Sequence, residues 1–350
     1  MIPLYSMITF FLLGLLSLSL ADPASEATPA TAGSPASQTV EALAKDASGV
    51  SSPNGAEESE EEKPPAENTP QKKKKPKAAP TPPSIPDGVR FEKDVPYLPE
   101  GRKEMADLYM PSVIPEGARL PAVLIIHGGG FNDGDKTKSR EINIGTNLAL
   151  NGYLAMSINY KLRKAQGQVT WPQNVQDCKS AVRWLRANAE RLHVDPDRIG
   201  VIGGSAGGNL AGMVAMTRPE DGLEPQGVLD GYPSGVRCAV IMYGAVDLMN
   251  LHDFKMFNKT RAEDPDVYKK ASPITYARAD TPPILILHGT ADKVVDVSQS
   301  RTLDEVLTTA GSPHELMIIP DAPHTFELQS FMDLRPKVIG FFDKYLKGNP

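Results

Sequence analysis

The feature that most constrains this chain is a serine with glycines on both sides, in residues 203–208 (GGSAGG). An apolar run, residues 198–202, precedes it, and a stretch of small residues with helical character follows it. Such a strand-to-helix turn strains the serine backbone, and only glycine neighbours let the strand and the helix pass so closely. The pattern predicts a nucleophile elbow with Ser205 at its tip. Because glycine and serine are common, this prediction depends on the motifs around it.

A second glycine-rich loop follows the predicted strand 121–126. Residues 127–131 read HGGGF, and the glycines of such a loop let backbone N–H groups turn inward beside the serine. We predict that the amides of Gly129 and Gly130, together with that of Ala206, form an oxyanion hole. They would stabilise the oxygen that becomes negative when Ser205 attacks a carbonyl carbon. The alternative is a glycine-rich loop that only caps a strand.

A serine hydroxyl is a poor nucleophile at neutral pH, so it needs a histidine to accept its proton and a carboxylate to orient that histidine. In hydrolases whose serine stands on such an elbow, the partners follow in the chain order serine, acid, histidine. Asp292 follows the predicted strand 283–288, and His324 follows the last predicted strand, 316–319. We therefore predict Ser205, Asp292 and His324 as the catalytic triad.

Two other aspartates could supply the acid. Asp296 stands at the start of the predicted helix 297–310, where a carboxylate is a common cap. Asp247 follows the predicted strand 239–243, an earlier position from which some hydrolases take their acid. None of the other five histidines follows the last predicted strand, which is where this fold places the base.

Short apolar runs alternate with segments of helical periodicity between these motifs. The pattern predicts an α/β fold with a doubly wound, mostly parallel sheet flanked by helices. Catalytic residues then fall at the carboxyl ends of strands, where such a sheet opens a crevice. The further predicted strands are 154–160, 199–203 and 240–243, and the predicted helices are 175–189, 207–216, 297–309 and 337–346.

These motifs resemble the α/β-hydrolase superfamily over residues 90–348. More narrowly, the chain is similar to hormone-sensitive-lipase-like and bifunctional feruloyl/acetyl-xylan esterase-like enzymes. Asn209 departs from that narrower group, where a histidine is frequent at this position. The resemblance implies a serine carboxylic-ester hydrolase that acts through an acyl-enzyme. The motifs behind the narrower resemblance are residues 107–111 (DLYMP), placed before the first core strand, 134–136 (GDK), 171–172 (WP), 205–210 (SAGGNL) and 271–274 (ASPI).

The resemblance says less about the substrate, because hydrolase sites of many kinds share one scaffold. An acetylated polysaccharide such as xylan is the expected substrate. The alternatives are a general short-chain carboxylesterase, an arylformamidase-like amide hydrolase and, in another class, a non-catalytic polysaccharide-binding protein. Phe131 and Trp171 are predicted to line the pocket, although Trp171 could instead be a core residue. Residues 249–270 are either a lid or an ordinary loop.

The N-terminal part of the chain has a different composition. Residues 1–21 carry an apolar core and end in SLA, which predicts a secretory signal peptide and a secreted or cell-envelope location. No Lys or Arg precedes this core, so a retained anchor associated with the envelope or membrane is the alternative. Residues 22–88 are rich in Pro, Ala, Glu and Lys and predict a disordered linker. Residues 89–350 remain for one catalytic domain.

Charge and cysteine usage exclude several other classes. The linker has eleven acidic and seven basic side chains, so it carries −4 of the chain's net charge of −6 and leaves a nearly neutral domain. Nucleic acid is therefore not an expected partner. No Cys/His cluster has zinc spacing and no glycine-rich loop has a phosphate-binding lysine, so we expect neither metal nor cofactor. Cys178 and Cys238 are expected as buried thiols rather than a disulfide. The oligomeric state is left open.

Overall fold

The computed structural model describes residues 84–326, 328–329 and 332–348. The predicted signal peptide, residues 1–21, and residues 22–83 of the predicted linker lie outside the described residues. Within the described part of the chain, no helix has both the length and the apolar character needed to cross a membrane.

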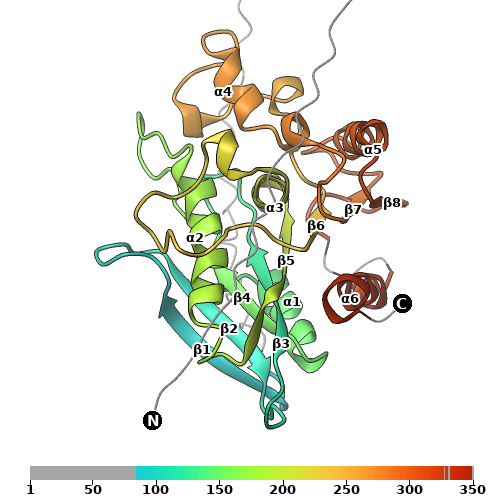
Figure 1. The fold of residues 1–350 in the computed structure, drawn as a ribbon. Helices are drawn as coiled ribbons and strands as arrows, with labels where there is room; N and C mark the ends of the chain where they lie inside the picture. Colours follow the sequence, from blue (N-terminus) through green and yellow to red (C-terminus); the bar gives the residue numbers. More distant parts are fainter. Residues whose placement is uncertain (1–83, 327, 330–331, 349–350) are drawn as a thin grey trace, which may run out of the picture. The chain divides into compact units, whose positions relative to one another are not determined.

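An eight-stranded sheet forms the centre of the fold, with the strand order β1-β2-β4-β3-β5-β6-β7-β8 (Figure 1). The first two strands run antiparallel to their neighbours, and all pairs from β4 to β8 are parallel. β3, β6 and β7 are buried along their whole length, as continuous apolar strands of a parallel sheet are. The predicted α/β class is therefore confirmed. The strands are β1 Val89–Pro96, β2 Met105–Pro111, β3 Leu120–Ile126, β4 Leu154–Ile158, β5 Val194–Gly204, β6 Cys238–Met242, β7 Ile284–Gly289 and β8 His314–Ile319.

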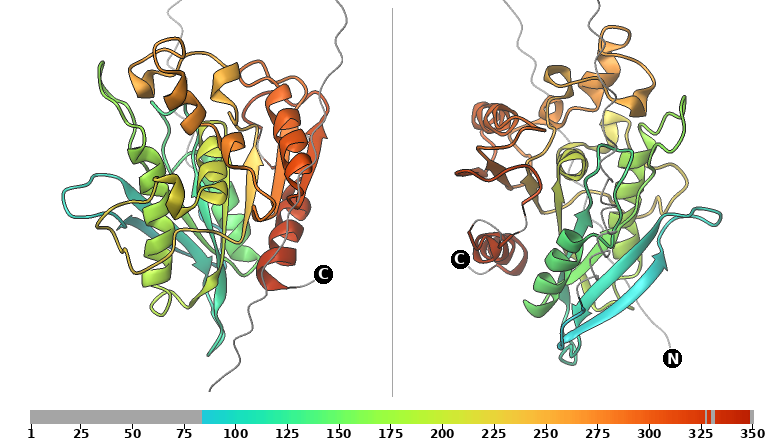
Figure 2. Two further views of the ribbon diagram at one scale, coloured as in Figure 1. Left: turned by 45° about the horizontal axis from the view of Figure 1, so that its top comes forward. Right: turned by 180° about the vertical axis from the view of Figure 1, so that it is seen from behind.

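Helices cover both faces of the sheet (Figure 2). The sheet separates the core into two apolar clusters. Side chains of α2, α3 and α5 belong to one cluster, and side chains of α1 and α6 belong to the other. The helices are α1 Ser139–Leu150, α2 Gln173–Ala187, α3 Ala206–Met216, α4 Pro265–Lys270, α5 Ser298–Ala310 and α6 Arg335–Phe342, which continues as a π-helix over Asp343–Lys347. Short 3-10 helices lie at Pro219–Asp221, Leu248–Asn250, Lys255–Phe257 and Pro273–Tyr276.

The hairpin of β1 and β2 and the helix α1 do not appear among the predicted elements. The DLYMP motif is itself part of β2, rather than a segment that precedes the first core strand. Its charged residue, Asp107, is fully buried and accepts a hydrogen bond from Lys136 Nζ at 2.6 Å. The same ammonium group is 2.7 Å from Asp94 of β1. A buried ion pair of this kind places charges inside a strand and hides its apolar pattern.

Both cysteines are free, buried thiols, as expected. Cys178 of α2 belongs to the core cluster on one face of the sheet, and Cys238 of β6 belongs to the cluster on the other face. The sheet therefore separates the two sulfur atoms. Burial raises the pKa of both thiols, which keeps them protonated and unreactive.

Candidate active site

Ser205 stands between β5 and α3 in a strained backbone conformation with positive φ, at φ 58° and ψ −123°. Its amide donates to the carbonyl of Met242 at 3.0 Å, which ties the turn to β6. A Cβ atom at Gly203 would lie 2.1 Å from the carbonyl oxygen of Gly207, and one at Gly207 would lie 2.1 Å from that of Ile126. Only glycine fits these contacts, so the GGSAGG pattern follows from the close approach of strand, turn and helix.

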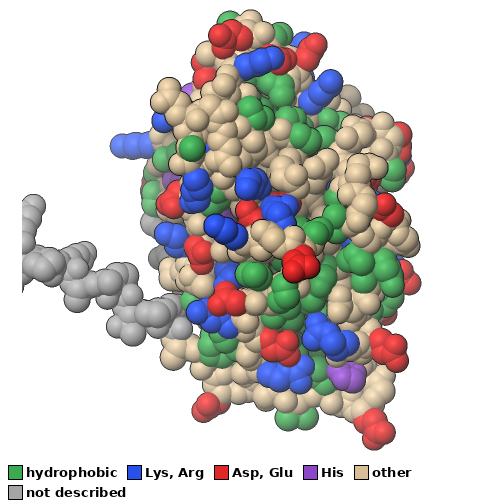
Figure 3. Space-filling model, turned by 90° about the vertical axis from the view of Figure 1, so that its left-hand side faces the viewer, with side chains coloured by type: hydrophobic (Ala, Val, Ile, Leu, Met, Phe, Trp, Pro, Cys, Tyr) green, Lys and Arg blue, Asp and Glu red, His purple; other side chains and the backbone are tan. Residues whose placement is uncertain are grey.

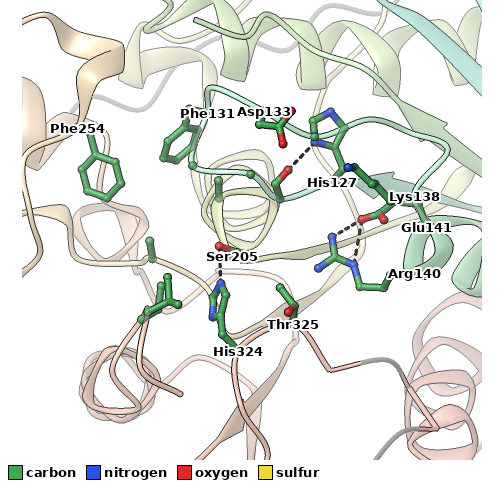
Figure 4. A pocket seen from close by; sticks show the side chains of 18 of the residues that line it. His127, Phe131, Asp133, Lys138, Arg140, Glu141, Ser205, Phe254, His324 and Thr325 are labelled. Atoms are coloured by element: carbon green, nitrogen blue, oxygen red, sulfur yellow. Dashed lines mark hydrogen bonds and ion pairs between the residues drawn. The ribbon is translucent and has the colours of Figure 1, made fainter. Parts of the chain in front are cut away.

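The three residues predicted as a triad come together from three loops. His324, on the loop after β8, points its Nε2 atom at Ser205 Oγ over 3.0 Å (Figure 4). Its Nδ1 atom lies 2.7 Å from Asp292 Oδ2, on the loop after β7. With Nδ1 protonated, His324 donates to Asp292, and its Nε2 is free to accept the serine proton.

Asp292 is surrounded by donors. Its Oδ1 accepts from the amides of Val294 and Val295 at 2.8 and 2.9 Å. Its Oδ2 lies near His324 and, at 3.2 Å, near Nε2 of His288. Burial of Asp292 raises its pKa, but the hydrogen bond from His324 and the two amides outweigh burial, so the pKa is below its usual value. The carboxylate therefore stays ionised beside the imidazole.

His288, which contacts Asp292, was not among the predicted site residues. It is fully buried at the end of β7, with Nδ1 2.6 Å from Ser300 Oγ and Nε2 2.9 Å from the carbonyl of Val295. Burial lowers the pKa of His288, so the ring is neutral near pH 7. Its spacing of four residues from Asp292, at the end of the same strand, is the signal that could have found it.

The two alternative acids are engaged elsewhere. Asp296 accepts from the amide of Ser298 at 2.9 Å, at the start of α5. Asp247 accepts from the amide of Met249 at 3.1 Å and caps a 3-10 helix. Among the described residues, neither carboxylate contacts His324. The structure therefore brings Asp292 to the histidine and keeps both alternatives away from it.

The HGGGF loop lies beside Ser205 and lines the same pocket (Figure 4). Gly129 has φ +124°, and a Cβ atom there would lie 2.1 Å from the carbonyl oxygen of Asp133. Within the described ranges, no backbone hydrogen bond is donated by the amides of Gly129 or Gly130. Ala206 is the first residue of α3, so its amide has no partner inside the helix. All three predicted oxyanion donors therefore lie at the pocket, and among the described residues their N–H groups have no hydrogen-bond acceptor.

A buried histidine supports this loop from behind. His127 stacks on the ring of Tyr160, with centroids 4.5 Å apart, and the Tyr160 hydroxyl donates to the carbonyl of His127 at 3.0 Å. The ring Nδ1 of His127 lies 2.8 Å from the carbonyl oxygen of Gly128 and donates to it. Burial lowers the pKa of His127 to about 4. The oxyanion loop therefore rests on a neutral imidazole.

This pKa predicts an acid-sensitive fold. Between pH 6.5 and 4 the unfolded chain protonates His127 while the folded chain does not, so protons favour unfolding as the pH falls. We expect this group to lower the free energy of unfolding by roughly 3 kcal/mol over that range. Urea unfolding at a series of pH values measures it. His127→Gln should flatten the pH dependence, and His252→Gln, at an exposed position, should leave it steep. Parallel curves for all three proteins would contradict the assignment.

The pocket above Ser205 has a volume of about 580 Å³ and two unlike walls. One wall is apolar and includes Phe131, which is fully buried and packs edge-to-face on Phe254 at 5.7 Å. Ala245, Val294 and Val295 are further apolar residues of the lining, and the polar side chains of Lys138, Arg140 and Glu141 lie on the other side of Ser205 from Phe131 and Phe254 (Figure 4). Within the described part of the chain, no group of three His, Cys, Asp or Glu side chains could hold a metal ion.

The aromatic lining differs from the sequence prediction at one residue. Phe131 lines the pocket, but Trp171 does not. Trp171 is half-buried and packs against the core, with its ring 6.2 Å from that of Phe257. The second aromatic residue of the pocket is instead Phe254, from the segment considered as a lid. Residues 249–270 thus contribute a wall of the pocket, which a motif search cannot see because the contact is made only in three dimensions.

A tyrosine outside the predicted set contacts the histidine of the triad. The ring of Tyr243, just after β6, meets the ring of His324 edge-to-face at 4.9 Å. Its hydroxyl accepts a hydrogen bond from Arg140, and Arg140 also pairs with Glu141. Burial raises the pKa of Tyr243, so the hydroxyl stays protonated. This packing restricts the orientation of the imidazole ring.

Asn209, where the resembling group often has a histidine, is fully buried in α3. Its side-chain amide donates to the carbonyls of Ala245 and Ala271, at 2.8 and 3.0 Å. These bonds join the nucleophile helix to the two loops that follow β6 and α4. The departure from the group's pattern therefore concerns packing and leaves the triad intact.

Comparison with known proteins supports the same assignment. Esterase LipQ of Mycobacterium tuberculosis is 30% identical over 246 residues, which are 67% of this chain and 57% of LipQ. The chain spans 53–57% of the length of the first curated relatives it matches. These relatives are therefore considerably longer than the region that they share with this chain.

Two solved structures share the fold over most of the domain. A truncated carbohydrate esterase from gut microbiota has a TM-score of 0.66 and 26% identity, and the match covers 74% of this chain and 96% of that one. The butyrate-bound esterase Est2 of Thermogutta terrifontis has a TM-score of 0.62 and 27% identity, with 76% and 96% covered. The predicted resemblance to α/β-hydrolase esterases is confirmed. The BD-FAE family profile matches residues 106–307, more than half of the chain, and the chain belongs to that family.

Proposed function

We propose that this protein is a serine carboxylic-ester hydrolase. The observation that carries the proposal is the hydrogen-bonded series from Ser205 through His324 to Asp292 at the base of a pocket. The oxyanion loop lines the same pocket beside the serine, and the amides of Gly129 and Gly130 donate no backbone hydrogen bond within the described residues. Nucleophile, base, orienting acid and oxyanion donors are the parts that acyl transfer requires.

The reaction proceeds through an acyl-enzyme. Ser205 Oγ attacks the ester carbonyl carbon while its proton moves to Nε2 of His324, and Asp292 stabilises the imidazolium that forms. The amides of Gly129, Gly130 and Ala206 hold the negative oxygen. His324 then gives its proton to the leaving alcohol as the carbon–oxygen bond breaks. Water, deprotonated by His324, hydrolyses the acyl-serine and restores the hydroxyl of Ser205.

The substrate is a polysaccharide that carries short acyl esters, such as acetylated xylan. Support comes from the two walls of the pocket, because the apolar side suits a short acyl group and the polar side suits the hydroxyls of a sugar. A structural neighbour described as a carbohydrate esterase agrees with this assignment. Export through residues 1–21 would place the enzyme in the cell envelope or outside the cell, where such polymers are met.

A general short-chain carboxylesterase is the second candidate. It is favoured by the butyrate bound to Est2, the structural neighbour from Thermogutta terrifontis. Both candidate functions use the same triad, and their substrates differ only in the alcohol part of the ester. Activity on a small ester therefore does not distinguish the two functions.

Hydrolysis of 4-nitrophenyl acetate, measured beside release of acetate from acetylated xylan, tests both. We expect the wild-type protein to act on both substrates and Ser205→Ala to act on neither. Activity on the small ester alone would favour the general carboxylesterase. Inactivity of the folded wild-type protein on both substrates would overturn the proposed function.

A further inference from the structure

A second, smaller groove of about 220 Å³ lies next to the pocket. Phe254 lines both cavities, so one aromatic side chain separates the groove from the pocket that holds Ser205. Basic and polar side chains make up most of its lining, and the esterase mechanism uses none of them. The lining residues are Arg163, Asp253, Phe254, Lys255, Asn258, Lys259, Thr260 and Glu263.

Three cations around this groove have no carboxylate partner among the described residues. Arg163 is tied to the oxyanion loop by its backbone amide, which donates to Phe131 at 3.0 Å, but its buried Nε atom has no partner. Lys255 is exposed, and its side chain makes no hydrogen bond or ion pair within the described ranges. Lys164 donates to the carbonyl of Asn132 at 3.2 Å and has no carboxylate within ion-pair distance among the described residues.

The carboxylates of the groove are already engaged. Asp253 pairs with Arg261 at 3.1 Å. Glu263 accepts from the amide and the hydroxyl of Thr260, at 2.7 and 2.9 Å. The remaining cation of the groove, Lys259, pairs outside it with a carboxylate of the α4 N-cap. Among the described residues that line the groove, Arg163 and Lys255 therefore outnumber Glu263, which has no cation within ion-pair distance, and the groove has a net positive charge.

The loop between β4 and α2, which carries Arg163 and Lys164, projects at the upper left of Figure 1. Figure 3 shows that side of the molecule, on which Lys and Arg side chains, in blue, are spread over the face with carboxylates, in red, between them.

We propose that the groove is an anion subsite, which binds the carboxylate of an acidic sugar next to the esterified sugar of the substrate. This inference rests on the proposed esterase function. The guanidinium of Arg163 offers the forked donors that match a carboxylate, and Lys255 adds a second positive charge in the same groove. The shared wall at Phe254 places the subsite directly beside the site of acyl transfer. Acidic polysaccharide esters are thus preferred over neutral ones.

Removal of the two groove cations tests the subsite. The variant Arg163→Gln/Lys255→Gln is compared with Lys93→Gln/Lys103→Gln, which removes two charges from β1 and the β1–β2 connection, outside both cavities. We expect the groove variant to lose about tenfold in kcat/KM on acetylated polygalacturonic acid, mainly through KM, because exposed ion pairs are individually weak. On acetylated xylan and 4-nitrophenyl acetate it should stay within about twofold of wild type. The control variant should match wild type on all three.

Salt and competing polymers complete the test. In 0.5 M NaCl the wild-type preference for the acidic substrate should disappear, because the Debye length falls to a few ångströms. Unesterified polygalacturonate should inhibit wild type more than the groove variant. Inhibition by dextran sulfate but not by polygalacturonate would overturn the carboxylate assignment in favour of sulfate. Equal losses on acidic and neutral substrates, or no preference in wild type, would overturn the subsite. All of these outcomes concern hydrolysis that Ser205→Ala abolishes. If the wild-type protein shows no such hydrolysis, the proposed esterase function fails, which is a different result from failure of the subsite.

Discussion

Replacing Ser205 by alanine should lower the turnover number on any ester substrate by about a millionfold. The hydroxyl is the atom that bonds to the acyl carbon, and no other described side chain lies at hydrogen-bond distance from His324 Nε2. Alanine keeps the Cβ atom and the backbone hydrogen bond from residue 205 to the carbonyl of Met242, which holds the turn. The loss is therefore chemical, and the stability of the fold should change little.

Turnover of 4-nitrophenyl acetate by purified proteins measures this effect, with circular dichroism to show that the variant is folded. Ser112→Ala, at an exposed position after β2, is the matched control and should retain full activity. Intact-mass analysis after treatment with a fluorophosphonate should show one adduct on wild type and none on Ser205→Ala. More than a hundredth of wild-type activity in Ser205→Ala would refute its role as nucleophile.

Asp292→Asn should lower the turnover number by about ten-thousandfold. The substitution keeps the size of the side chain, but an NH2 group in the place of Oδ2 cannot accept the hydrogen bond from His324 Nδ1. Asparagine can keep its oxygen toward the amides of Val294 and Val295, which turns the NH2 group toward the histidine. The imidazole then holds its proton on Nε2, facing Ser205, where it cannot act as a base.

The two alternative acids provide controls for this prediction. Asp296→Asn and Asp247→Asn remove a carboxylate of the same type from positions that have no contact with His324 among the described residues. Both variants should stay within a few-fold of wild type in kcat. A ten-thousandfold loss in either, with Asp292→Asn still active, would transfer the role of the acid. Urea unfolding of each variant separates loss of activity from loss of stability.

The parts of the site that depend on short motifs could be predicted from the sequence. The elbow requires glycine because a Cβ atom at Gly203 or Gly207 would collide with backbone 2.1 Å away. Such contacts lie within a few residues of Ser205 or on the strand beside it, so they leave a local pattern. His324 and Asp292 were predictable because the loops after β8 and β7 open at the same end of the sheet.

Other parts left no such pattern. The strand β2 was missed because its buried Asp107 is neutralised by Lys136, which lies 29 residues further along the chain. Trp171 was predicted in the pocket but packs against Phe257, and Phe254 takes the aromatic place beside Phe131. Each of these outcomes depends on which distant segment a side chain meets.

The sequence by itself determined the α/β class, the order of the chemical groups and the identity of nucleophile, base and acid as hypotheses, because these follow from local backbone constraints and strand periodicity. Only the tertiary structure decided which residues surround that chemistry. Tyr243 beside His324 and Phe254 beside Phe131 are contacts between segments far apart in the chain. The packing of helices and strands against one another sets such contacts. The energy of each contact depends on the burial and the charge of its surroundings, to which several distant segments contribute.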